Sequence, residues 1–150
     1  MRLPHVLSVL AVVSGAVPAA AGTRSTLPGP IPAEVVEVVD GDTLAVRATV
    51  WLGQAVDIHV RLAGVDTPER RARCGQERDL AEEAARLTRR LVAGGEVRLF
   101  DVMADKYGGR VRARVETADG ADLARALLAS GLARPYGGGR REGWCEAAAP

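Results

Sequence analysis

The sequence predicts a mainly β (α+β) fold in which five strands form a small barrel and two helices flank it. Three observations lead to this prediction: short runs of β-branched or alternating apolar residues, turn signals between them, and two segments with helical spacing. The 150 residues are 47% hydrophobic and carry a net charge of +1. Such values are typical of one globular domain and exclude a disordered or collagen-like chain.

The first two strands are predicted to form an antiparallel hairpin. Residues 34–39 (EVVEVV) are mostly β-branched and end at Asp40-Gly41, a turn signal. In residues 43–50, apolar side chains at the even positions alternate with a mixed set at the odd positions. Residues 57–62 then predict a third strand with Ile58, Val60 and Leu62 on one face, so that Arg61 points away from them.

Residues 76–92 predict an amphipathic helix, because Leu80, Ala84, Leu87 and Leu91 recur at helical spacing before Gly94-Gly95.

Two further strands, residues 96–102 and 110–116, precede a second helix at 122–130. The resulting order, β-β-β-α-β-β-α, suits a closed or nearly closed Greek-key barrel of the OB type. Barrels of this type bind nucleic acids or sugars in many unrelated proteins, so the fold alone names no function.

The N-terminal residues 1–21 have the pattern of a secretory signal peptide. Arg2 precedes an apolar run, and Ala19 and Ala21 form an A-x-A cleavage signal. Ser8, Ser14, Gly15 and Pro18 interrupt the run, which argues against a membrane anchor. We therefore expect a secreted or periplasmic protein with a Pro-rich linker at 22–32 and one domain at 33–150.

The two cysteines, Cys74 and Cys145, are expected to form a disulfide, since an exported chain meets an oxidising compartment. A metal site at these cysteines has little support, because neither belongs to a CxxC motif and His59 is the only histidine after the leader. A lone histidine among strand residues is more often a surface group than a ligand.

Four polar segments lie at predicted strand ends: DGDT (40–43), RLAGVDTPE (61–69), DKYGGR (105–110) and GLARPY (131–136). In this order and on this strand pattern they resemble the staphylococcal nuclease (thermonuclease) family, over about residues 34–136. The sequence departs from the family in two places. Gly109 is an extra residue in the usual DKYGR motif, and the longer C-terminal helical region of the secreted staphylococcal enzyme is missing.

The resemblance implies a Ca²⁺ site. Asp42 and Asp66 would supply carboxylate ligands and Thr67 a backbone carbonyl, with Asp40 behind them. Ca²⁺ accepts an irregular shell of oxygen ligands, and a hard cation can neutralise the oxygens of a phosphodiester under attack. Each aspartate taken alone also fits a turn or a local hydrogen bond, so the set rather than any member favours the ion.

The resemblance also implies catalytic roles for three charged residues. Arg61 and Arg110 match the family arginines that hold the phosphate, a task for which a guanidinium's two parallel N–H donors are suited. Glu69 matches the proposed general base, a role that could instead be positional. Arg61 could alternatively be a solvated strand residue, and so could Arg110, which follows the extra Gly109.

Substrate contacts are implied for Lys106 and Tyr107 near the terminal phosphate and for Tyr136 beside the base. Tyr107 could equally be a packed aromatic residue. Trp51 and Trp144 could stack on bases or cover loops, and the basic cluster Arg70, Arg71, Arg73 could contact phosphates or be solvated.

Together with the signal-peptide pattern, the resemblance implies an exported, calcium-dependent phosphodiesterase that acts on DNA and RNA, preferably single-stranded, and leaves 3′-phosphate ends. We expect a monomer without stable membrane association. The alternative is a weak or inactive OB-type module that binds nucleic acid or protein, with catalysis impaired by Gly109. The acidic groups favour the enzyme, because binding a polyanion does not require them.

Overall fold

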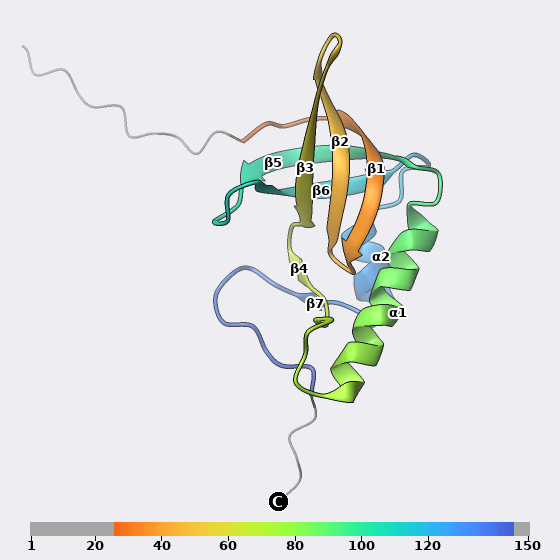
Figure 1. Cartoon of the computed structure of the whole chain (residues 1–150), viewed down its shortest axis with the longest axis vertical. Coiled ribbons are helices and arrows are strands. Elements are labelled where there is room, and N and C mark those ends of the chain that lie inside the picture. The colour runs from red at the N-terminus through yellow and green to blue at the C-terminus, as the bar shows by residue number, and fades with distance from the viewer. Residues whose placement is uncertain (1–25, 146–150) are drawn as a thin grey trace, which may run out of the picture.

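The computed structural model describes residues 26–145 of the chain (Figure 1). The predicted signal peptide and its cleavage site lie outside the described residues. The elements in chain order are β1 (Ile31–Asp40), β2 (Thr43–Trp51), β3 (Gln54–Leu62), β4 (Val65–Asp66), α1 (Gly75–Leu91), β5 (Glu96–Ala104), β6 (Arg110–Thr117), α2 (Leu123–Ala129) and β7 (Arg134–Pro135). Neither helix in this part of the chain has the length and apolar character that a membrane crossing needs.

Five strands close into a barrel in the order β1-β2-β3-β6-β5, which confirms the predicted mainly β, OB-type architecture with two helices. Four of the five pairings are antiparallel, and β3 pairs with β6 in parallel. The parallel pairing aligns Arg61 near the end of β3 with Arg112 near the start of β6. The turn that leads into β6 therefore lies beside the end of β3.

The barrel core follows the predicted alternation of side chains along the strands. Leu44, Val46, Val60 and Val115 are almost completely buried. At the far end of the β2–β3 hairpin the alternation no longer produces burial, because the hairpin extends beyond the barrel (Figure 1). Trp51 is 73% exposed there.

Helix α1 lies against the barrel with a face of small residues rather than with its leucines. Ala81, Ala84, Ala85 and Thr88 are buried. The predicted stripe was correct at Ala84, whereas Leu87 and Leu91 are only partly buried against the core. Small side chains are needed because the helix approaches the β1–β2 turn closely.

The predicted linker at residues 22–32 needs correction at its C-terminal end. Strand β1 begins at Ile31, where Ile31 and Pro32 pair with β5, and Leu27 forms an isolated bridge with Val102. A proline is tolerated near the start of a strand because its missing N–H interrupts little of the hydrogen-bonding ladder there.

Strands β4 and β7 were not predicted from the sequence. They pair Val65 with Pro135 and Asp66 with Arg134 in a separate two-stranded sheet. Strands of two residues carry no periodic pattern, so sequence alternation does not reveal them. Their pairing brings the C-terminal segment beside the Asp66 loop.

Candidate functional site

A cleft of about 760 Å³ lies where the β1–β2 turn, the end of β3, the loop after β4, the β5–β6 turn and the C-terminal segment meet. The predicted site residues in its lining are Asp40, Asp42, Arg61, Thr67, Glu69, Lys106, Tyr107, Arg110 and Tyr136. Asp66 is not in the lining, but its carboxylate contacts Arg61 and Arg141, which are.

Asp42 is held in the tight turn between β1 and β2. Its side chain is 3% exposed and accepts hydrogen bonds from the Thr43 hydroxyl at 3.0 Å and the Thr67 backbone N–H at 3.1 Å. The Thr88 hydroxyl of α1 donates to the Gly41 carbonyl at 2.7 Å. The helix and the loop after β4 thus fix the orientation of this carboxylate.

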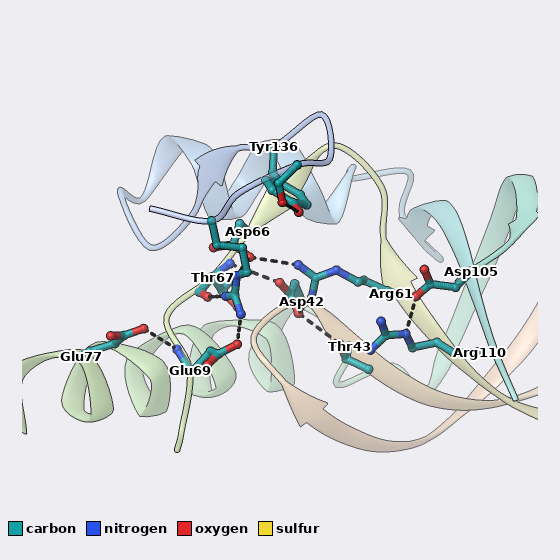
Figure 2. A network of polar contacts seen from close by, with 12 residues as sticks. Asp42, Thr43, Arg61, Asp66, Thr67, Glu69, Glu77, Asp105, Arg110 and Tyr136 are labelled. Atoms are coloured by element: carbon teal, nitrogen blue, oxygen red, sulfur yellow. Dashed lines mark hydrogen bonds and ion pairs between the residues drawn. The ribbon is translucent and has the colours of Figure 1, made fainter. Parts of the chain in front are cut away.

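Arg61 joins the two predicted carboxylate ligands, as Figure 2 shows. Its two terminal nitrogens donate to Asp42 Oδ1 at 2.7 Å and to Asp66 Oδ1 at 3.0 Å. The Arg61 side chain is 16% exposed and the Asp66 side chain 6%. Arg61 is therefore an internal member of the cleft and not a solvated strand residue.

Arg110 begins β6 and lies against Asp105 (Figure 2), which the sequence analysis did not single out. Arg110 Nε is 2.5 Å from Asp105 Oδ2, and the Lys106 backbone N–H donates to the other Asp105 oxygen at 2.7 Å. Burial of Asp105 opposes its ionisation, yet these hydrogen bonds from Lys106 and Arg110 lower its pKa overall. Its position in the DKYG motif was the available sequence signal.

The extra Gly109 occupies the turn before β6. It has a φ of +75°, a left-handed conformation that suits glycine, and Arg110 is the first residue of the strand. The extra residue is thus absorbed in the turn, and Arg110 reaches the cleft. Arg112 also lines the cleft, with a more exposed side chain than Arg110.

The predicted substrate-binding residues lie on the open side of the cleft. Tyr107 is 57% exposed, and its ring is flanked by Lys106 and by the Arg110 guanidinium, 4.8 Å from the ring centroid. The Tyr136 hydroxyl donates to the Gly139 carbonyl at 2.7 Å. His59 is exposed on β3 and is not in the lining.

Asp40 lines the cleft at the end of β1. Partial burial and the neighbouring charge of Asp42 raise its pKa, although Arg70, Arg61 and Arg141 oppose the shift. A carboxyl group with this tendency is easier to protonate than an exposed aspartate.

Arg141 is the main cleft residue that sequence reasoning missed. Its Nε lies 2.6 Å from Asp66 Oδ1, a terminal nitrogen donates to the Thr67 carbonyl at 2.9 Å, and a second terminal nitrogen pairs with Glu69. Nothing in the run GGGRREGW distinguishes Arg141 from Arg140. Only the folded path of the C-terminal segment brings it into the cleft.

Cys74 and Cys145 form the expected disulfide, with Cα atoms 6.0 Å apart. Cys74 is also the N-cap of α1. Glu77 lies close to both sulfurs, and the three residues together satisfy the spacing of a metal-binding group. Because both sulfurs are in the disulfide, they are not thiolate ligands.

The donor set in the cleft suits a hard divalent cation. Asp42, Asp66 and the Thr67 carbonyl offer oxygen atoms, the carboxylates are buried, and guanidinium groups already contact them. Buried carboxylates need such positive partners because an unpaired charge inside a protein is costly. Arginines on the same cleft add donors suited to a phosphate.

Comparison with known proteins agrees with this geometry. The family described as "Staphylococcal nuclease homologue" matches residues 59–143, more than half of the 150-residue chain. A comparison with curated proteins gives no match. The matched range includes Arg61, Asp66, Arg110 and Arg141, while Asp42 precedes it. Membership indicates nuclease-type function or nucleic-acid binding, and the chain belongs to the staphylococcal nuclease homologue family.

Proposed function

We propose that this protein is an exported, calcium-dependent phosphodiesterase that hydrolyses DNA and RNA. The observation that carries the proposal is the shared Arg61 guanidinium, which holds the buried carboxylates of Asp42 and Asp66 together beside the Thr67 backbone. Export rests on the signal-peptide pattern of residues 1–21.

Asp42, Asp66 and the Thr67 carbonyl would hold the Ca²⁺ ion. When bound, the ion supplies positive charge that offsets the negative charge developing on the phosphate. Asp40, with its raised pKa, would adjust the charge behind these ligands.

The chain's own residues would carry the remaining steps. Arg61 and Arg110 would donate N–H bonds to the non-bridging phosphate oxygens, and Glu69 would accept a proton from the attacking water. Water attacks phosphorus in line with the 5′ oxygen. The bond to that oxygen breaks, the oxygen takes up a proton, and the phosphate stays on the 3′ oxygen.

Single-stranded nucleic acid is the preferred substrate in this proposal. Tyr107 is exposed beside Arg110, and Tyr136 lines the same cleft. Aromatic rings stack on bases only where those bases are unpaired. The site is built within one chain, so a monomer suffices for the reaction.

The test is cleavage of denatured DNA by the purified protein across a calcium titration, repeated in EGTA. We expect hydrolysis with Ca²⁺ only. Asp42→Ala should abolish it, because a buried ligand is removed, while His59→Ala should stay within a few-fold of the wild type. The cleaved ends should be 3′-phosphates.

Two results would contradict the proposal. Equal cleavage in EGTA would remove the metal from the mechanism. Binding of DNA without cleavage at any calcium concentration would instead support the alternative, a nucleic-acid binding module on the same barrel.

A further inference from the structure

The guanidinium of Arg141 lies against the oxygen atoms assigned to the metal ion. It contacts the Asp66 carboxylate and the Thr67 carbonyl, two of the three proposed ligands, and also the Glu69 carboxylate. The Arg141 side chain is only 33% exposed. A cation of the chain itself therefore occupies part of the space that a divalent ion would need.

Two arginines neutralise the two buried carboxylates from different positions. Arg61 binds both Asp42 and Asp66 from β3, and Arg141 binds Asp66 from the C-terminal segment. Adding a divalent ion while both guanidinium groups remain would place like charges within a few ångströms, which is unfavourable at a poorly solvated site. A guanidinium group and the ion also compete for the same Asp66 and Thr67 oxygen atoms, so one set of guanidinium contacts gives way when the ion binds.

Arg141 holds the Asp66 carboxylate less firmly than Arg61 does, although it also donates to the Thr67 carbonyl and pairs with Glu69. Both contacts of Arg61 are aligned hydrogen bonds. Arg141 Nε lies close to Asp66 Oδ1, yet its N–H makes no hydrogen bond within the described residues. Arg61 is fixed on a barrel strand, whereas Arg141 lies on a segment outside the helices and strands. Arg141 is thus the group that the ion displaces.

The C-terminal segment that carries Arg141 is fastened at several points. Arg134 donates to the Gly143 carbonyl at 3.0 Å and covers the Trp144 ring, with 3.8 Å to its centroid. Trp144 is 8% exposed, and Cys145 next to it is bonded to Cys74. The disulfide, four positions after Arg141, limits how far this guanidinium moves from the cleft.

We propose that Arg141 is an internal competitor for the divalent cation, and that the Cys74–Cys145 disulfide keeps it in competition. This inference rests on the calcium-dependent function proposed above and adds a residue that sets the calcium requirement. If the contacts of Arg141 close the site in about ten of eleven molecules, the apparent calcium affinity falls about tenfold.

Isothermal titration calorimetry of Ca²⁺ into the oxidised protein tests the inference without reference to activity. Arg141→Gln should lower the Kd for Ca²⁺ about tenfold. Arg140→Gln is the matched control: it removes the same charge from the next residue, which is exposed and forms no ion pair in the described part of the chain. Its Kd should stay within about twofold of the wild type.

Reduction supplies a second measurement on the same proteins. Reducing the disulfide should lower the wild-type Kd toward that of Arg141→Gln and leave the Kd of Arg141→Gln unchanged. Circular dichroism in each state verifies that the barrel stays folded. An unchanged Kd of folded, reduced wild type would overturn the role of the disulfide.

The outcomes separate this inference from the proposed function. A protein that cleaves DNA with Ca²⁺, but in which Arg141→Gln binds Ca²⁺ no more tightly than Arg140→Gln, overturns the competitor role alone. Weaker binding by Arg141→Gln would also overturn it, since Arg141 would then support the ligands. No Ca²⁺ binding by any of the three proteins would overturn both.

Discussion

The carboxylate of Asp105 connects the β5–β6 turn to the side of the cleft that we propose binds phosphate. It accepts the Lys106 backbone N–H and the Arg110 side chain at the same time. Asp105 has a 6% exposed side chain, so this pairing is shielded from water. Arg110 is oriented by the turn that contains Gly109 and by one buried acid.

Replacing Arg110 by alanine should lower kcat roughly a hundredfold or more, since loss of one preorganised donor costs about 3 kcal/mol of transition-state stabilisation. Arg112→Ala, on the more exposed part of the lining, should change kcat only modestly. Steady-state kinetics on denatured DNA, with thermal unfolding as a check of folding, measures both. Near-normal turnover of Arg110→Ala in an active nuclease would show that another group holds the phosphate.

Asp105→Asn should lower stability in a pH-dependent way. The folded pKa of Asp105 lies below its ordinary value of 3.8, so its contribution is present above that value and is lost as pH falls through the folded pKa. At pH near 7 the loss should be about 1.5–3 kcal/mol, the usual range for a hydrogen bond to a charged group. Urea unfolding at neutral pH and near pH 3 should show the difference between wild type and variant shrinking.

Asp79→Asn is the control for this measurement. Asp79 is exposed on α1 and forms no ion pair with an arginine among the described residues. Its substitution should change stability by less than about 0.5 kcal/mol at either pH. A pH-independent effect of Asp105→Asn would contradict the charge argument.

Sequence motifs predicted most of the cleft residues because these residues lie in short segments at strand ends and turns. Such segments can be recognised from consecutive residues of the sequence. Asp42, Arg61 and Arg110 meet in one cleft as expected. Arg141 could not be found this way, since its position depends on a disulfide and a segment that has no periodic pattern.

At the level of elements, the packing of α1 on the β1–β2 turn controls the side of the cleft where we propose that the metal ion binds. A Cβ at Gly41 would lie 2.6 Å from the Ala84 Cβ and 3.1 Å from the Thr67 hydroxyl. Such a distance between carbon atoms requires the helix or the turn to shift. The small residues of α1 and the glycine between Asp40 and Asp42 therefore belong to one closely packed contact.

Gly41→Ala should destabilise the protein by about 1–3 kcal/mol through overpacking, and should weaken activity by moving Asp42. Gly94→Ala is the control, because a Cβ at Gly94 meets nothing within 4 Å and this glycine has no positive φ. Urea unfolding of both variants measures the difference. Equal free energies of unfolding for Gly41→Ala and Gly94→Ala would mean that α1 can move away from the β1–β2 turn at little energetic cost.

Periodicity predicted the type of each long element but not the exact face of α1. Leu80, Leu87 and Leu91 dominate its hydrophobic pattern, yet the closest approach selects alanines and Thr88. The burial of a side chain depends on the distance between the packed elements as well as on its hydrophobicity. A sequence pattern shows the hydrophobicity but not that distance.

At the level of the whole molecule, the disulfide joins the start of α1 to the C-terminal segment across a sequence separation of 71. In the chain-entropy account, closing a loop of this length lowers the entropy of the unfolded chain. The free energy of unfolding rises by about 4 kcal/mol as a result. The barrel itself contains neither cysteine. Breaking the disulfide should therefore lower the free energy of unfolding while the structure of the folded barrel changes little.

The double substitution Cys74→Ser with Cys145→Ser should lower the free energy of unfolding by about 2–4 kcal/mol while far-UV circular dichroism stays nearly unchanged. Urea unfolding of the oxidised wild type and the variant measures this. Reduced wild type should match the variant. If the free energy of unfolding falls by less than about 0.5 kcal/mol, the unfolded chain gains little conformational entropy when the disulfide is absent.

The closed barrel was predictable because strand count, strand order and the intervening helix leave few topologies for so short a chain. The parallel pairing of β3 with β6 results from closure of the barrel. No local sequence pattern predicts it. Its register, with His59 opposite Arg110, decides which arginines face the cleft.

That parallel seam also determines when the proposed activity arises during synthesis. Arg61 and Arg110 lie on opposite sides of it, so a growing chain that ends before β6 has the acidic ligands but only half of the phosphate grip. Arg141 and its cysteine tether emerge from the ribosome later still. Under the proposed function, messenger RNA and other nucleic acids near the site of translation would therefore meet an incomplete phosphate grip until β6 has been made.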